Sequence, residues 1–337
     1  MRGSRARGAG AAGLTPGTDS INRAALDCKW SPDGKKFAVA SGAKCVPVCS
    51  YEQQNDWWIS RIIKKGIRSS VLGVAWHPSS HLVATASSDF RARIYSAHIP
   101  EVDGSGVKTI ICGDTASTGF GDLLAEFAGS NGWVEGAPRA AAAGGEATDP
   151  RAPHAAVSFS FNGFALAYVG HDATLNICTW DEKNPTAEPN QESLKELVLP
   201  STKVVWLSDQ IIVTAGHDFR PFVYQHPGPN RGSWKFLGSL DKEPDAKKDA
   251  PAPAAGDQTG FAASKSLWTN KTVKAQDTSS SQQDSAELWT KHANTIVDMK
   301  ILGDTVYSTK VDTLSTAGLD GRVVVWKAKG ALPNLAL

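Results

Sequence analysis

One pattern occurs four times along the chain, in DFRARIY (residues 89–95), DATLNIC (172–178), DFRPFVY (218–224) and DGRVVVW (320–326). In each segment an Asp in a tight turn precedes an alternating strand that ends on Tyr, Cys or Trp. SGAKCVPVC (41–49) repeats the pattern with Ala43 in the Asp position. The interval from Ala43 to Asp89 is 46 residues, and so is the interval from Asp172 to Asp218. A strand-rich repeat slightly longer than about 40–45 residues is typical of a WD-type β-propeller blade.

The segments around these turns predict an all-β chain with the fold of a WD-repeat β-propeller. Five blades are recognisable over residues 21–328, each with an alternating strand, a Pro/Gly/Asn/Asp turn, a strand ending in small residues, the Asp turn and a further strand. Residues 21–100, 154–240 and 291–328 are expected to form four-stranded antiparallel blades.

Four further segments interrupt or flank the blades. Residues 101–153 are rich in Gly, Ala and Ser, and residues 241–290 in Lys, Asp, Ser and Gln, which predicts two long loop insertions. Residues 1–20 read as a disordered or spurious N-terminal tail, with a mitochondrial presequence as the alternative, and residues 329–337 as a C-terminal tail.

Composition favours binding to proteins over binding to nucleic acid or membranes. The formal net charge is +1, so no overall field attracts a polyanion. No apolar run approaches the ~20 residues of a membrane span. The five cysteines are scattered and three lie in strand patterns, which indicates buried thiols in a reducing compartment such as the cytoplasm.

Several residues have the types found in catalytic or metal sites, but their patterns favour structural roles. His292, Ser315, Asp320 and Trp326 have the types of a Ser-His-Asp constellation, but in WD repeats such residues form a hydrogen-bonded network inside a blade. The turn aspartates Asp89, Asp172 and Asp218 occupy the same position as Asp320. Cys45 and Cys49 have a spacing compatible with zinc, but no partner pair follows, so buried packing is favoured. We therefore expect no catalytic residue, no metal and no cofactor.

Several stretches resemble one family closely. NDWWISRIIKKGIRSSVLGVAWHP (55–78), SSDFRARIYSAHIPEVD (87–103) and VTAGHDFRPFVY (213–224) are similar to the actin-related protein 2/3 complex subunit 1 family, the WD-repeat subunit of an actin nucleator. The resemblance implies seven blades, so the first two are expected to be lacking here and ring closure is in doubt. It also implies a non-enzymatic cytoplasmic scaffold in the actin cytoskeleton.

The partners implied by the resemblance are the other subunits of that complex, actin filaments and nucleation-promoting factors. The alternatives are a WD-repeat adaptor that presents partners in another complex, and a propeller enzyme. An enzyme would need a convergent polar pocket near the central channel, and an adaptor would carry a separate recruiting domain.

A basic cluster and an aromatic pair are candidate contacts for such partners. Arg61, Lys64, Lys65 and Arg68 lie between two blades, where they form either a solvated surface or a contact for an acidic partner. Trp57 and Trp58 are adjacent in a strand and therefore point to opposite faces. One is expected to pack between blades, and the other, taken as Trp58, to be available to a partner.

The second insertion contains one further candidate. In FAASKSLWTNK (261–271), the side chains of Phe261, Leu267 and Trp268 fit one face of a short amphipathic helix. They are candidate anchors in a groove on a partner. The alternative is a small cluster that packs back on the propeller.

Overall fold

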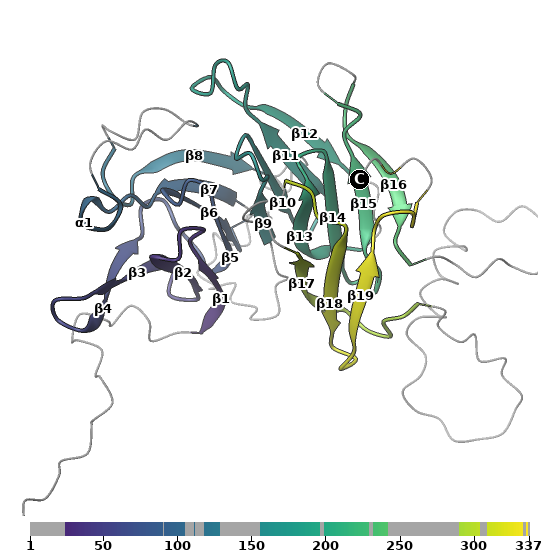
Figure 1. The fold of residues 1–337 in the computed structure, drawn as a ribbon, viewed down its shortest axis with the longest axis horizontal. Helices are drawn as coiled ribbons and strands as arrows, with labels where there is room; N and C mark the ends of the chain where they lie inside the picture. The colour runs from purple at the N-terminus through teal and green to yellow at the C-terminus, as the bar shows by residue number, and fades with distance from the viewer. Residues whose placement is uncertain are drawn as a thin grey trace, which may run out of the picture.

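The computed structural model describes residues 24–89, 91–104, 111, 118–128, 156–195, 199–228, 232–241, 290–303, 309–332 and 335. These residues form five antiparallel β-sheets arranged as a fan, with the first and last sheets at its two ends (Figure 1). Each sheet follows the chain order of its strands. The all-β, propeller-like arrangement predicted from the repeats is confirmed.

The first two sheets have four strands each. The first contains β1 (Ala25–Trp30), β2 (Lys36–Ser41), β3 (Val46–Glu52) and β4 (Trp57–Ile63). The second contains β5 (Val71–Trp76), β6 (Leu82–Ser87), β7 (Arg91–Ser96) and β8 (Leu123–Ala128), with the short helix α1 (Pro100–Asp103) after β7.

The other three sheets follow the same order. The third contains β9 (Ala156–Phe159), β10 (Ala165–Val169), β11 (Leu175–Thr179) and β12 (Asn190–Leu194). The fourth contains β13 (Ser201–Ser208), β14 (Ile211–Gly216), β15 (Phe222–Gln225) and β16 (Lys235–Ser239). The fifth contains β17 (Ile296–Leu302), β18 (Thr313–Gly318) and β19 (Val323–Lys327).

The core lies between successive sheets. Four apolar clusters, one for each neighbouring pair of sheets, join side chains of both. The first strand of each sheet contacts the first strand of the next, from β1 through β5, β9 and β13 to β17. A sheet with two apolar faces cannot bury both alone, so each interior sheet is stabilised by its two neighbours.

Hydrogen bonds recur at these junctions at intervals of one repeat. Trp76 Nε1 donates to the carbonyl of Lys29 at 2.8 Å, and Trp206 Nε1 donates to the carbonyl of Ser158 at 3.0 Å. Trp76 is the last residue of β5 and Trp206 lies near the end of β13, and both bond to the first strand of the preceding sheet. The repeat therefore fixes the register between sheets as well as the strands within them.

The junction of the second and third sheets uses a histidine in place of a tryptophan. His77 Nε2 donates to the carbonyl of Gly163 at 3.2 Å, and His77 Nδ1 accepts from the backbone N–H of Ser79 at 3.1 Å. His77 is 5% exposed, and burial lowers its pKa from 6.5 to about 4. The neutral ring is therefore the form that fits this junction.

We expect this histidine to make the fold sensitive to mild acid. Between about pH 6.5 and 4 the unfolded chain binds a proton at His77 that the folded chain excludes, so stability falls as the pH falls through this range. From pH 7 to pH 5 the contribution of His77 is a loss of about 2 kcal/mol. Urea denaturation of the wild type and of His77→Gln at both pH values measures it, with half-buried His226→Gln as the control. Equal losses in all three proteins would contradict the assignment.

One predicted boundary is wrong. Residues 101–153 were expected to form one loop, but Leu123–Ala128 within them is β8, which pairs with β7. Phe127 of this strand is buried in the core, with 4% of its surface exposed. The strand is short and its flanking sequence is rich in Gly and Ala, so the composition of the whole segment did not indicate it. The described part of the fifth sheet has three strands, and residues 304–308 of the predicted four-stranded blade lie outside the described residues. Residues 1–20 and 242–289 lie outside the described residues.

Candidate partner-binding surfaces

The outer face of the first sheet carries an exposed aromatic surface. Its side chains, here called the aromatic face, are Leu26, Trp30, Phe37, Tyr51 and Trp58. Trp30 is 56% exposed, and Trp58 lies 5.1 Å from Phe37 and 5.8 Å from Trp30 between ring centroids. The opposite face of the same sheet, with Ala38, Val46 and Val48, is buried against the second sheet. One face of this end sheet is thus packed, and the other is left to solvent.

Trp30 has the same place in its sheet as two buried tryptophans. It ends β1, as Trp76 ends β5, and Trp206 has the corresponding position in β13. Trp76 is 8% exposed and Trp206 is 2% exposed, because each packs on the preceding sheet. The described residues place no sheet before β1. The exposure of Trp30 therefore follows from its position at the end of the fan.

The fifth sheet presents a second apolar face at the other end of the fan. Val323 is 71% exposed and Val325 56%, while Leu314 and Trp326 of the same sheet are buried against the fourth sheet. Near the hub, burial and then the neighbouring ammonium of Lys29 lower the pKa of Lys300. Lys29 of β1 and Lys300 of β17 therefore interact at the hub, and the carboxylates of Asp27 and Asp298 partly offset their repulsion.

Two residues of the basic cluster predicted from the sequence form ion pairs, and the other two are exposed. Arg61 pairs with Glu101 at 3.1 Å, and Lys65 pairs with Asp122 at 3.1 Å. Lys64 and Arg68 are exposed, and no ion pair joins them to another residue in the described part of the chain. Two of the four charges therefore tie the first and second sheets together, and the side chains of Lys64 and Arg68 are exposed to solvent.

The prediction for the adjacent tryptophans is wrong in one respect. Trp57 and Trp58 are both 41% exposed, so neither packs between two described sheets. Trp58 joins the aromatic face, and Trp57 Nε1 donates to Glu52 Oε2 at 3.1 Å. The period-two rule placed them on opposite faces, but it could not show that both faces near the sheet's edge are partly open.

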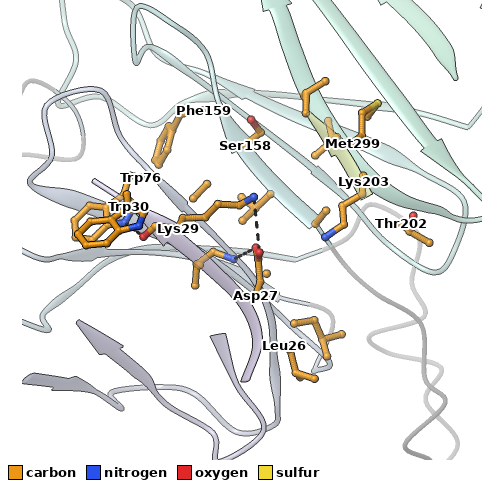
Figure 2. A pocket seen from close by; sticks show the side chains of 18 of the residues that line it. Leu26, Asp27, Lys29, Trp30, Trp76, Ser158, Phe159, Thr202, Lys203 and Met299 are labelled. Atoms are coloured by element: carbon orange, nitrogen blue, oxygen red, sulfur yellow. Dashed lines mark hydrogen bonds and ion pairs between the residues drawn. The ribbon is translucent and has the colours of Figure 1, made fainter. Parts of the chain in front are cut away.

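The hub of the fan holds a pocket of about 350 Å³ lined by the first strands of all five sheets (Figure 2). Asp27 Oδ2 accepts from the backbone N–H of Val74 at 3.3 Å, and Asp27 Oδ1 lies 3.7 Å from Lys29 Nζ. Thr202 and Lys203 of β13 line the same pocket. Asp27 thus joins β1 to β5, and Thr202 Oγ1 joins β13 to β17 because it donates to the carbonyl of Ile296 at 2.5 Å.

Comparisons with known proteins decide the family. Residues 61–96 match the family described as "WD domain, G-beta repeat". The chain is 34% identical over 312 residues to "Actin-related protein 2/3 complex subunit 1A-A" of Xenopus laevis, covering 92% of this chain and 71% of that protein. It is 33% identical over 310 residues to "Actin-related protein 2/3 complex subunit 1A" of Arabidopsis thaliana, covering 91% and 71%. Against "Actin-related protein 2/3 complex subunit 1" of Schizosaccharomyces pombe the identity is 31% over 314 residues, covering 91% and 74%.

The chain belongs to the actin-related protein 2/3 complex subunit 1 family. The resemblance stated from the sequence is confirmed. Among solved structures, "Structure of U3-55K" matches with a TM-score of 0.51 at 12% identity, covering 92% of this chain, which itself spans 63% of that structure. At that identity the match supports the propeller-like fold alone. The described part of the chain contains no helix with the length and apolarity needed to cross a membrane.

In this member of the subunit 1 family, the fifth sheet contains a hydrogen-bonded polar network. His292 Nδ1 lies 3.2 Å from both carboxylate oxygens of Asp320, and His292 Nε2 lies 2.7 Å from Thr316 Oγ1. Trp326 Nε1 donates to the same Thr316 hydroxyl at 2.7 Å. His292 is fully buried, so this network satisfies polar groups inside the sheet and contains no exposed nucleophile.

Thr316 takes the place in this network that was expected for Ser315. Neighbouring residues of a strand point to opposite faces, and Thr316 lies on the face that packs on the fourth sheet. Ser315 pairs across the sheet with exposed Val325 and is itself half-buried. A one-residue shift in a strand therefore decides which hydroxyl meets the histidine.

The other turn aspartates make different contacts. Asp89 receives two hydrogen bonds from the guanidinium of Arg93, at 3.1 and 2.8 Å, and Arg93 Nε donates to Glu126 at 2.7 Å. Asp172 accepts from the backbone N–H of Thr174 at 3.2 Å. Asp218 lies half-buried in the corresponding turn after β14. Asp320 is thus joined to a histidine and Asp89 to an arginine, so equivalent turns use different partners.

The described part of the structure does not bring the remaining predicted residues into a common site. Cys45 and Cys49 are buried, and burial raises the pKa of Cys49 to about 11, which disfavours the thiolate that zinc requires. Neither belongs to a described cluster of metal-ligand side chains. Phe261, Leu267 and Trp268 lie outside the described residues.

Proposed function

We propose that this chain is a non-enzymatic scaffold subunit of the actin-related protein 2/3 complex, acting in the cytoplasm in actin filament nucleation and branching. One observation carries the proposal: relatives named as subunit 1 of that complex, from a frog, a plant and a yeast, are 31–34% identical to it over about 90% of its length. Stacked sheets with regular junctions are rigid, and rigidity lets a subunit hold partners in a fixed geometry.

The two end faces of the fan support a role in assembly. Exposed apolar patches of this kind mark surfaces that are covered in the working state of a protein. Since Trp30 matches Trp76 and Trp206 in position, we propose that a further blade-like sheet packs on the aromatic face. The five described sheets are then part of a larger ring, and seven blades is the number that the family resemblance implies.

The proposed contacts with partners use the exposed charges and the second insertion. Lys64 and Arg68 are exposed beside the first two sheets, where they suit an acidic surface of a neighbouring subunit or activator. Phe261, Leu267 and Trp268 would anchor a short helix on actin filaments or on a nucleation-promoting factor. Burial of each apolar anchor contributes about 1.5–3 kcal/mol, partly offset by the ordering of the segment.

Branching by a reconstituted complex tests the proposal. The complex assembled with this chain is expected to form branches on labelled actin filaments when an activator is present. The double substitution Leu267→Ala and Trp268→Ala is expected to lower the branching rate by about tenfold, which corresponds to roughly 1.4 kcal/mol of lost binding. Assembly of the complex should be unchanged.

The matched control replaces polar neighbours in the same segment, Ser264→Ala and Lys265→Ala, and should keep the wild-type rate. A complex that assembles but branches equally well with either double variant would remove the insertion from the proposal. Failure of the wild-type chain to assemble with the other subunits would overturn the proposed function itself.

A further inference from the structure

Three side chains that ligate metals meet beside the second sheet. His81 lies in the turn between β5 and β6, His98 follows the end of β7, and Asp103 is the last residue of α1. One nitrogen or oxygen atom from each lies within 4.8 Å of those of the other two. The two imidazole rings have centroids 5.4 Å apart and are tilted by 37°. The turn and the segment after β7 thus bring two histidines and a carboxylate to one point.

Two of these side chains have buried atoms without a partner. His81 Nδ1 and Asp103 Oδ1 are inaccessible to solvent and make no hydrogen bond with the described residues. His81 is 9% exposed, and the Asp103 side chain is 1% exposed. A buried lone pair without a partner is destabilising, and in native proteins it calls for a specific explanation such as a bound ion.

Other bonds orient the three ligands. His98 Nε2 lies 3.1 Å from the carbonyl of Gly104, which can only accept, so Nε2 carries the proton and Nδ1 keeps a lone pair. Asp103 Oδ2 accepts from the backbone N–H of Ile99 at 2.7 Å and from Lys36 Nζ at 2.5 Å, which leaves Oδ1 open. Bonds of this kind behind a ligand fix its tautomer and orientation in known metal sites.

The charge state of the cluster is compatible with a cation. A neutral imidazole with an open ring nitrogen is the form that binds metals, and Nδ1 of buried His81 makes no hydrogen bond with the described residues. Lys35 Nζ lies 3.5 Å from the carbonyl of Val102, next to Asp103. The other nearby positive group among the described residues is Lys36, whose ammonium is held by Asp103 and the carbonyl of Ala97. It contacts the Oδ2 side of the carboxylate, away from the open oxygen.

We propose that His81, His98 and Asp103 bind a zinc ion, with water in the fourth position. Two imidazole nitrogens and a carboxylate oxygen are a ligand set typical of zinc with one open position. Zinc–ligand distances of about 2.0–2.2 Å place tetrahedral ligand atoms about 3.3 Å apart. The three atoms must therefore move inward by about an ångström, and half-buried His98 on its connecting segment can supply that movement.

A zinc ion here would clamp the junction of the first and second sheets. Asp103 already reaches Lys36 at the start of β2, while His81 and His98 belong to the second sheet. The ion would therefore link the turn between β5 and β6 to α1 and, through Asp103, to the first sheet.

Titration of the purified, EDTA-treated full chain with zinc sulfate tests the proposal. Calorimetry is expected to show one zinc ion per chain, and zinc at a hundred times its Kd to raise the Tm by roughly 3–6 °C. Cobalt(II) in place of zinc is expected to give the visible absorption of a four-coordinate site without a thiolate charge-transfer band. His98→Ala is expected to weaken zinc binding at least about tenfold and to abolish the rise in Tm.

Two further variants make the result decisive. Exposed His171→Ala removes a histidine elsewhere and should bind zinc as the wild type does. His98→Cys keeps a ligand and should retain one zinc ion, with a thiolate band on cobalt binding. Absence of zinc binding by the folded wild type would overturn the proposal, as would equal binding by a folded His98→Ala. If His98→Ala fails to fold, a cobalt spectrum of His98→Cys without a thiolate band would overturn it.

Discussion

Replacing Trp206 with Ala is expected to lower the free energy of unfolding by about 3–5 kcal/mol, because a large buried side chain is lost and a cavity remains. Trp206 is 2% exposed, donates to the carbonyl of Ser158 and packs against Trp234 with ring centroids 5.6 Å apart. Its removal also deletes this hydrogen bond at the junction of the third and fourth sheets. Urea denaturation followed by far-ultraviolet circular dichroism measures the change.

Trp30→Ala is the matched control, since the two tryptophans hold corresponding places in their sheets. Trp30 is 56% exposed, so its loss should cost the isolated chain less than about 1.5 kcal/mol. Equal costs for the two substitutions would contradict the view that the aromatic face is uncovered in the isolated chain. In the assembled complex the cost of Trp30→Ala should rise toward that of Trp206→Ala.

Gly163→Ala is expected to destabilise the fold by about 3 kcal/mol or more, from two separate causes. The backbone at Gly163 has a φ of +81°, which a side chain adopts only with strain. A Cβ atom there would also lie 2.3 Å from Nε2 of buried His77, so the imidazole ring or the two sheets would have to shift. Overpacking of a tight contact adds about 1–3 kcal/mol.

Gly34→Ala separates these causes, because Gly34 lies in the corresponding turn of the first sheet. Its φ is +71°, and a Cβ there would meet nothing within 4 Å. This variant should therefore cost only the backbone strain, about 1–2 kcal/mol. Thermal and urea unfolding of the two variants should differ by the cost of the clash with His77, and identical unfolding would show that the junction is loose.

The sequence revealed the parts of the fold that repeat. The Asp turns at Asp89, Asp172, Asp218 and Asp320 each precede a strand, and alternation placed the first strands correctly, as for Ala25–Trp30 and Val71–Trp76. Such signals are local, since a turn and a period of two need no knowledge of distant residues. The family resemblance rests on the same stretches.

What the sequence did not reveal depends on contacts between distant segments. β8 is a short strand that is stabilised by pairing with β7 and by Glu126 bound to Arg91 and Arg93. Thr316 and Ser315 differ only in the face to which they point. His81, His98 and Asp103 are unremarkable in the chain and meet only because two connections of the second sheet converge. Sequence periodicity does not predict which side chains from distant segments come into contact.

Affinity purification of the tagged chain from the cells that express it, with quantitative mass spectrometry, tests the central claim most directly. The account predicts that actin-related proteins and the other subunits of their complex are recovered in near-equal amounts with the chain. It also predicts that they are strongly enriched over an unrelated β-propeller used as bait. Recovery of a different assembly, with the actin-related proteins no more abundant than on the control bait, would contradict it.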